Sequence, residues 1–310
     1  MMTLRCLFQL ICFPAVLVVG GTLWADAPDA KPAVEIELLE AGQEPRRAIR
    51  FTPAAGDKLT VAMTMKMSQG MTINGAAQPP TPLPTQKFTM DMSVNDVKAN
   101  GDVHYGFAYT DIEVFDDPQN PSPAVAAIQG LVQPMVGTKG SGVITNRGFS
   151  KEAEFEIPEN LNPMLKSMLE GMKDSINQLS SPVPEEAIGL GAKWRTVQNV
   201  TSNGIKLKQT IEHEVTAVDE KGITTEFTLT QEAEPQEVKN ASLPPGVSVK
   251  LDSIDTKGSG TSQLISDSIF PAVHTTSVAS KINMTIAVAG QTQKTTTDMK
   301  MEMTLEPAKP

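Results

Sequence analysis

The sequence predicts a mainly β protein, a duplicated antiparallel curved sheet that forms an open or half barrel, with one or two helices covering it. Three observations predict this class. Long segments alternate apolar and polar residues, glycine-containing turns separate them, and the pentapeptide TKGSG occurs twice, at Thr138–Gly142 and Thr256–Gly260. Period-two alternation is typical of half-buried antiparallel strands. Two sheets too small to bury their faces alone would join into one.

Three strands are predicted in the N-terminal half, at residues 58–68, 86–97 and 103–109. The turn Asn100-Gly101 before the third is a strong hairpin signal. Because side chains alternate along a strand, each strand has one apolar face. The three apolar sets are Val61, Met63, Met65 and Met67; Phe88, Met90, Met92 and Val94; and Val103, Tyr105, Phe107 and Tyr109.

The C-terminal half repeats this logic. Turns at residues 202–204, 219–222 and Gly290 separate alternating strands, the last of which covers residues 295–305. Its apolar sets are Ile205, Leu207, Ile211 and Val215; Ile223, Phe227 and Leu229; and Val278, Ile282, Met284, Ile286 and Val288. AGDKL at residues 55–59 and LGAKW at residues 190–194 open the two halves. We therefore expect half-repeats at about 45–158 and 185–306 within one domain, residues 45–310.

Two segments are predicted to be helical. Ser122 and Pro123 form a helix-start signal before AVAAIQGLV. A second helix is expected at about residues 162–180, capped by Asn162 and joining the two half-repeats. Its apolar stripe has helical spacing and consists of Leu161, Leu165, Met168, Met172, Ile176 and Leu179.

The first 27 residues have the features of an export signal. Arg5 precedes an apolar run from Leu7 to Leu23, and Ala25-Asp26-Ala27 fits a cleavage site. Residues 28–44, rich in Pro, Ala and acidic residues, are expected to be a flexible lead. No later run reaches the roughly 20 apolar residues of a membrane-spanning helix. We expect an exported protein, periplasmic or extracellular, soluble or peripherally attached, without a transmembrane span after signal removal.

Composition argues against several classes of function. The net charge is −10 and no basic cluster occurs, so nucleic-acid binding is not expected. Both cysteines, Cys6 and Cys12, lie in the signal, and no G-x-S-x-G motif occurs. Nucleophilic catalysis therefore lacks a candidate residue. We expect no enzymatic activity and no cofactor.

Methionines alternate with polar residues in three of the predicted strands, most clearly in DMKMEM at residues 298–303. Three interpretations remain open: packing of the core, the wall of an adaptable apolar cavity with the second helix as a lid, and a thioether site for Cu(I). The candidate cavity residues are Met63, Met65, Met67, Met90, Met92, Met164, Met168, Met172, Met299, Met301 and Met303.

Two histidines, His213 and His274, lie in register with apolar stripes, which is the usual position of a partly buried structural histidine. The copper interpretation would add them to Met299, Met301 and Met303 as ligands. No H-x-H or H-E-x-x-H spacing occurs, so a zinc site or a histidine-based copper site has little support.

Several stretches resemble uncharacterised secreted proteins common in planctomycete-type bacteria. They are GQEPRRAIRF at residues 42–51, TKGSGVITNRG at residues 138–148, LGAKW and the methionine-alternating strands, together with the signal. The resemblance implies a secreted domain of unknown function and supplies no catalytic residues. The architecture alone is remotely similar to the half-barrel lipoprotein carriers of bacterial envelopes.

The function expected is that of a non-enzymatic envelope protein that binds an apolar ligand, a lipid or acyl group, between the curved sheet and the methionine-rich helix. The alternatives are a Cu(I)-binding envelope protein that uses Met-x-Met strands and a structural or interaction module of the envelope. Candidate partners are a lipid or another apolar small molecule, and an envelope protein.

Overall fold

The computed structural model describes residues 34–116, 122, 124–157, 161, 165–166, 169, 182–202, 204–238, 246–288 and 290–308. The predicted signal at residues 1–27 lies outside them. Most of the second predicted helix also lies outside, including Met164, Met168 and Met172.

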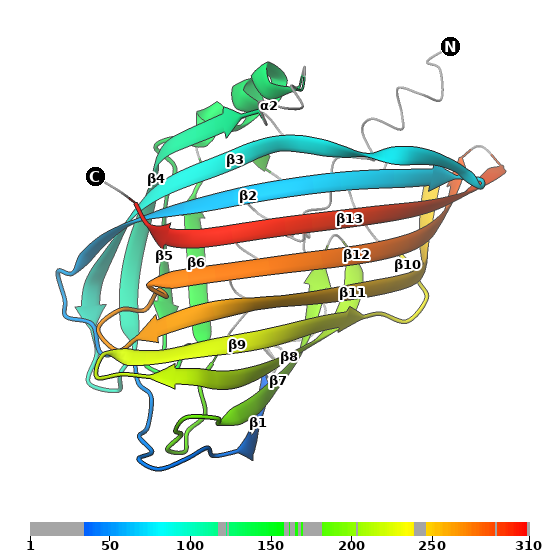
Figure 1. Cartoon of the computed structure of the whole chain (residues 1–310). Coiled ribbons are helices and arrows are strands. Elements are labelled where there is room, and N and C mark those ends of the chain that lie inside the picture. The colour runs from blue at the N-terminus through cyan, green and yellow to red at the C-terminus, as the bar shows by residue number, and fades with distance from the viewer. Residues whose placement is uncertain are drawn as a thin grey trace.

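One thirteen-stranded antiparallel sheet dominates the fold. The order along the sheet is β1-β7-β8-β9-β11-β12-β13-β2-β3-β4-β5-β6, with the two-residue β10 paired to β11. Figure 1 shows β2, β3, β13, β12, β11 and β9 side by side, while β5 and β6 lie behind them. The sheet is curved and not closed, with β1 and β6 at its edges. This confirms the predicted mainly β, open architecture.

The strand bounds follow the predicted alternation and extend it at several ends. The strands are β1 (Glu35–Glu40), β2 (Lys58–Ile73), β3 (Ala76–Val97), β4 (Val103–Phe115), β5 (Lys139–Ile144), β6 (Ser150–Glu156), β7 (Lys193–Ser202), β8 (Ile205–Val218), β9 (Gly222–Glu232), β10 (Gln236–Glu237), β11 (Val247–Ile265), β12 (Val273–Val288) and β13 (Gln291–Pro307).

The sheet consists of two meanders, β2–β6 and β7–β13, which meet where β13 pairs with β2. Thr138–Gly142 runs into β5, and Thr256–Gly260 lies in β11. The glycines of the first copy pair with residues of β4, and those of the second copy pair with residues of β9. Gly140 lies opposite Phe107 of β4, and Gly260 lies opposite Phe227 of β9. Gly140 is the third residue of its copy and Gly260 the fifth, and at the fifth position of the first copy Gly142 lies opposite Tyr105. A glycine opposite an aromatic residue therefore occurs in both halves.

Two segments differ from the expectation. Residues 35–40 of the expected flexible lead form β1, because Ile36 and Leu38 pack beside Trp194 in one apolar cluster. The hairpin at Asn74 and Gly75, both with positive φ, extends β3 back to Ala76. Residues 76–84 of β3, where four prolines occur, pair with β2 on one side, and pairing with β4 begins at Thr85. Prolines are tolerated there because an edge strand does not need every N–H.

The first predicted helix is α2 (Val125–Val132), followed by the 3₁₀ turn η1 (Gln133–Met135). Its N-cap is Ala124 rather than Ser122, whose hydroxyl accepts a hydrogen bond from the Ala124 N–H at 3.2 Å. Gln129 binds the exposed edge of β4: its side-chain oxygen accepts from the Val114 N–H at 2.7 Å, and its amide donates to the Ile112 carbonyl at 2.9 Å. The helix thus supplies partners where β5 no longer pairs with β4.

Residues 41–57, which contain the whole GQEPRRAIRF stretch, tie several turns together at one end of the sheet. Backbone hydrogen bonds join Phe51 to Asn146 and Thr52 to Ser266. The Arg47 guanidinium donates to the carbonyl oxygens of Asp219 at 2.6 Å and Gly222 at 2.7 Å. The segment therefore connects turns from both halves of the sheet.

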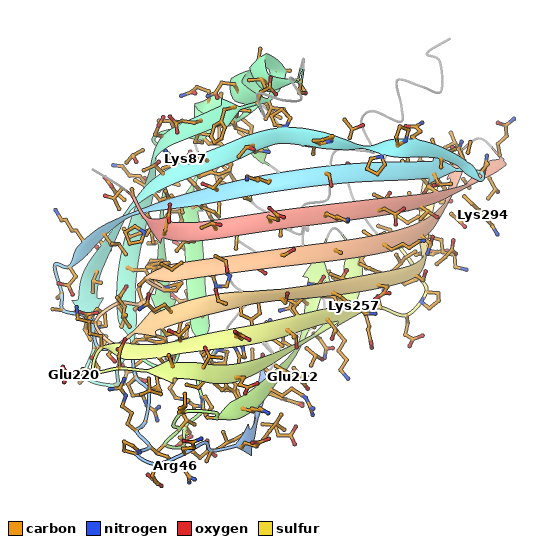
Figure 2. All side chains as sticks on the ribbon, viewed as in Figure 1. Arg46, Lys87, Glu212, Glu220, Lys257 and Lys294 are labelled. Atoms are coloured by element: carbon orange, nitrogen blue, oxygen red, sulfur yellow. The ribbon has the colours of Figure 1, made fainter. Side chains whose placement is uncertain are left out.

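The two faces of the sheet differ in polarity. We call the face that carries Met65, His213 and Phe227 the inner face, because the apolar clusters lie on it. We call the opposite face, which carries exposed charges such as Glu212 and Lys257, the outer face (Figure 2). On the inner side, Phe270 from the β11–β12 loop packs edge-on against Tyr105 of β4, with ring centroids 5.8 Å apart.

Candidate ligand-binding face

The methionine-rich strands are neighbours in the sheet. Strand β2 lies between β13 and β3, although β13 is more than 200 residues away in sequence. Met301 is opposite Met67, and Met303 is opposite Met65. We call this set the methionine seam; it comprises Met63, Met65, Met67, Met90, Met92, Met299, Met301 and Met303, all on the inner face. The structure thus brings together every candidate methionine that it describes.

The seam is only partly buried. Met65, Met67, Met92 and Met299 are buried, whereas Met63, Met90, Met301 and Met303 are half-buried. Residues from the connection between β6 and β7 belong to the same apolar cluster as part of the seam. Leu165 and Leu169, one helical turn apart, are 1% and 0% exposed and belong to the same apolar cluster as Met65 and Met92. Two residues of the predicted lid segment therefore share an apolar cluster with part of the seam.

The two histidines belong to a row of neighbouring rings on β7, β8, β9 and β12, in which Trp194–His213 and Phe227–His274 are stacked and His213–Phe227 is tilted at 44°. The Trp194 and His213 rings stack with centroids 4.6 Å apart and planes at 8°. His213 lies 5.9 Å from Phe227, and Phe227 lies 5.3 Å from His274 at 12°. Gly260 makes this possible, because a Cβ there would meet the Phe227 ring at 2.6 Å. The Phe227 ring separates the two imidazoles.

His213 is buried without a polar partner. It is 7% exposed, and neither ring nitrogen has a hydrogen-bond partner in the part of the chain that the structure describes. Burial, with a smaller contribution from the charge of His274, lowers the pKa of His213 to about 4. Burial also lowers the pKa of His274. Both imidazoles are therefore neutral near pH 7, and His213 presents one N–H donor and one acceptor nitrogen.

A second polar feature crosses five strands of the inner face. We call it the glutamine row: Gln198, Gln209, Gln231, Thr256 and Ser280, on β7, β8, β9, β11 and β12, each opposite the next. All five are buried. The Gln231 amide donates to the Gln209 side-chain oxygen at 2.7 Å, and the Thr256 and Ser280 hydroxyls share a hydrogen bond of 2.7 Å. The row is a polar stripe inside an otherwise apolar face.

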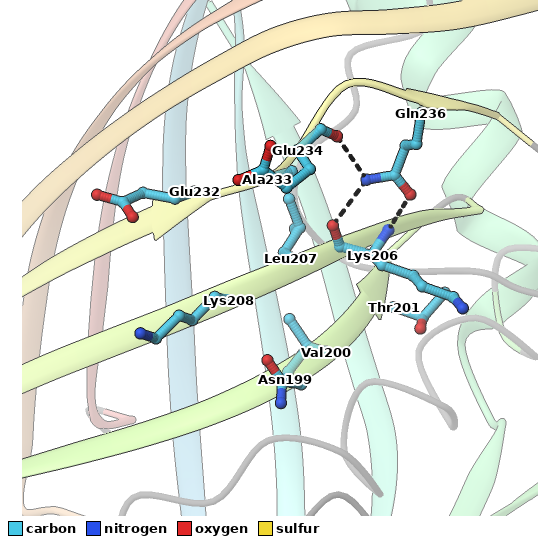
Figure 3. Close-up of a pocket in the computed structure, with 10 residues that line it drawn as sticks. All are labelled: Asn199, Val200, Thr201, Lys206, Leu207, Lys208, Glu232, Ala233, Glu234 and Gln236. Carbon is cyan, nitrogen blue, oxygen red and sulfur yellow. Dashed lines mark hydrogen bonds between the residues drawn. The ribbon is translucent and has the colours of Figure 1, made fainter.

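A hollow of about 1000 Å³ adjoins the glutamine row (Figure 3). Buried Val200 and Leu207 in its wall lie two residues along from Gln198 and Gln209 on the same face. At its rim, Gln236 holds the start of β8: its side-chain oxygen accepts from the Lys206 N–H at 2.8 Å, and its amide donates to the Lys206 carbonyl at 2.9 Å. The hollow therefore combines these apolar side chains with charged ones, Lys206, Lys208, Glu232 and Glu234.

The proposed copper ligands do not converge. His213 on β8 is separated from β13 and its methionines by β9, β11 and β12, and the Phe227 ring lies between the two imidazoles. Within the described ranges, no group of three or more His, Cys, Asp or Glu side chains is arranged to hold a metal ion. The set Met299, Met301, Met303, His213 and His274 is therefore not assembled as one site.

The sequence interpretation missed the glutamine row and the Trp194–His213 stack. Gln209 lies between Leu207 and Ile211 in the predicted strand, so its place on the apolar face was visible in the alternation. Its polar neighbours come from strands up to about 70 residues away, and only sheet register aligns them.

Comparisons with known proteins identify no family. No protein-family model matches the chain, and no curated protein matches it. Among solved structures, the toluene transporter TodX of P. putida shares 7% identity over 83% of this chain and 91% of that one, with a TM-score of 0.20. OmpT, an outer membrane protein of Vibrio cholerae, shares 6% identity over 80% of this chain and 100% of that one, with a TM-score of 0.19. These scores carry no argument about this chain. Among the described residues, no helix has the length and apolar character to cross a bilayer.

Proposed function

We propose that this protein is a non-enzymatic, exported protein of the cell envelope that binds an apolar ligand, a lipid or acyl group, on the inner face. The observation that carries the proposal is the methionine seam, which gathers thioether side chains from three adjacent strands on one face. Flexible, polarizable methionines re-pack around ligands of varied shape. The ligand would lie between the seam and the segment that contains Leu165 and Leu169.

The half-buried members of the seam support binding over packing alone. Met63, Met90, Met301 and Met303 keep part of their surface accessible, although their face is the covered one. A closed core would bury them fully, since interiors pack at crystal-like density. Export is supported by the sequence of residues 1–27.

The test uses adjacent residues on opposite faces of β13. Met301→Gln is expected to weaken binding of the apolar fluorophore N-phenyl-1-naphthylamine about fivefold, because an amide at an apolar contact costs about 1 kcal/mol. Lys300→Gln, on the exposed outer face, is the matched control and should leave the affinity unchanged. Fluorescence titration measures both.

Equal affinity in wild type, Met301→Gln and Lys300→Gln would contradict binding at the seam. A native mass spectrum of the protein purified from its own host's envelope adds an independent result. Bound mass in the range of a lipid is expected, whereas a bare chain together with no fluorophore binding would favour the structural or interaction module.

Copper binding is a second candidate, favoured by the opposition of Met301 to Met67 and of Met303 to Met65. These pairs present four thioether sulfurs on one face, and soft sulfur suits Cu(I). Replacing all four by leucine conserves volume and removes the sulfurs. If Cu(I) binds there, anaerobic competition with a Cu(I) indicator should show a loss of about a hundredfold in affinity or more, since coordination depends on the sulfurs. Unchanged affinity excludes the site.

A further inference from the structure

The inner face carries polar groups that a purely apolar ligand leaves unexplained. Burying a polar atom without a hydrogen bond is costly, so each such atom in a native structure requires a reason. Both ring nitrogens of His213, the Thr196 hydroxyl and the Gln231 side-chain oxygen are buried without a hydrogen-bond partner across the described ranges.

These orphaned groups lie on three neighbouring strands and are spread over a strand length of four residues, about 13 Å. Trp194 is opposite His213, and Thr196 is opposite Ile211, so Thr196 and His213 are diagonal neighbours on one face of β7 and β8. Gln231 is opposite Gln209, four residues before His213 on the same face of β8. Together they outline a patch across β7, β8 and β9 that offers hydrogen-bond donors and acceptors to a bound group.

The patch lies between a hollow of mixed polarity and the methionine seam. Its glutamine end adjoins the hollow of about 1000 Å³, whose wall includes Val200 and Leu207. In the other direction along the glutamine row, Ser280 of β12 is opposite Met299 of the methionine seam. A molecule with a polar group at the patch could therefore extend an apolar chain along the inner face.

The patch carries no charge. Every buried polar side chain in the described part of the chain is a Thr, Ser, Gln or His, and burial keeps His213 neutral near pH 7. A carboxylate or phosphate buried there would have no cation to pair with, which is strongly unfavourable. A hydroxyl or amide can both donate to and accept from neutral Gln, Thr and His, and an ester can accept from them.

We infer that the ligand is an amphiphile whose polar group is uncharged and hydrogen-bonding, held by Gln231, Thr196 and His213, with its apolar chain on the inner face. This inference rests on the proposed function and specifies its ligand class. It separates acyl glycerols and similar neutral amphiphiles from fatty acids and phospholipids.

Two probes with the same acyl chain test the inference. Monoolein has a neutral glycerol ester, and oleate has a carboxylate. At pH 8, below the critical concentration of each probe, monoolein is expected to displace N-phenyl-1-naphthylamine with at least about tenfold higher affinity than oleate, because the patch offers oleate no cation.

Variants assign the preference to the patch. His213→Phe retains the ring stack and removes both nitrogens, and Gln231→Leu removes the amide. Each should reduce the advantage of monoolein to about threefold or less, with oleate affinity unchanged, since only the neutral head group uses these atoms. His104→Phe, at a half-buried histidine of β4 away from the patch, should keep the full advantage.

The outcomes are distinguishable. If monoolein and oleate displace the fluorophore equally, or oleate does so more tightly, the inference fails and the proposed function stands. If the fluorophore itself does not bind, the proposed function fails and the inference fails with it. If His213→Phe and Gln231→Leu both keep the tenfold advantage, the patch is not the site of recognition.

Discussion

Acidification from pH 7 to pH 4 is expected to lower the free energy of unfolding by about 3 kcal/mol through His213 alone. Its pKa is about 4 in the folded protein against an ordinary value of 6.5. Between these values the unfolded chain binds a proton that the folded chain does not. Stability therefore falls as the pH falls through this window, and the full loss is present below pH 4.

Other titrating groups fall into two classes. Burial lowers the pKa of His274, so it acts in the same direction as His213. Hydrogen bonds from Lys98 and Lys151 lower the pKa values of Asp96 and Asp102 below 3.8. Their stabilising effect is lost only at more acidic pH, so the interval between pH 6.5 and 4 reports chiefly on the histidines. Urea unfolding followed by Trp194 fluorescence at four pH values in this interval measures the slope.

His213→Phe is the decisive variant. It should raise the free energy of unfolding at pH 7 by about 1–2 kcal/mol, because it removes two buried nitrogens without partners, and it should flatten most of the pH dependence. A slope in His213→Phe equal to that of the wild type would contradict this account. If His213→Phe is more stable and has lost the preference for monoolein over oleate, His213 lowers stability in exchange for ligand recognition, a common trade-off at binding sites.

Alanine at Gly140 or Gly260 is expected to destabilise the fold by about 2–3 kcal/mol, because added volume in a packed site forces its neighbours to move. A Cβ on Gly140 would lie 2.2 Å from the Phe107 ring and 2.6 Å from the Glu154 carbonyl oxygen. On Gly260 it would lie 2.0 Å from the Thr275 carbonyl oxygen and 2.6 Å from the Phe227 ring. In both cases a backbone atom has to shift together with a ring.

Gly130→Ala is the matched control. Gly130 lies in α2, and an added Cβ there would meet nothing within 4 Å. This variant should stabilise the protein by about 0.5–1 kcal/mol, since alanine has a higher helix propensity than glycine. Thermal and urea unfolding of the three variants give the comparison. If Gly140→Ala and Gly260→Ala matched Gly130→Ala in sign, the close approach of the aromatic rings would not be a constraint on these strands.

Loss of stability at both Gly140 and Gly260 would also bear on the internal duplication. Each TKGSG copy would then place a glycine under an aromatic ring of the neighbouring strand, although Gly140 is the third residue of its copy and Gly260 the fifth. Disturbance at Gly260 has a further expected consequence, because Phe227 lies between His213 and His274. Head-group preference should fall in Gly260→Ala and remain in Gly140→Ala.

The sequence by itself determined the class of the fold and the face on which most side chains lie. Alternation in β2, β4, β8 and β13 is a local property, since successive side chains point to opposite faces whatever strand lies alongside. Asn100-Gly101 and Gly290 likewise marked their turns through their own backbone preferences. The predicted grouping of Met299, Met301 and Met303 on one face follows from the same geometry.

The tertiary structure alone decided which strands are neighbours. The pairing of β13 with β2 creates the methionine seam, the pairing of β1 with β7 gives order to part of the expected lead, and register across five strands aligns the glutamine row. The Trp194–His213–Phe227–His274 stack depends on the absence of a side chain at Gly260, on a strand between those of Phe227 and His274. Such features arise from contacts between residues far apart in the chain. Local alternation carries no information about which distant strands pair with each other.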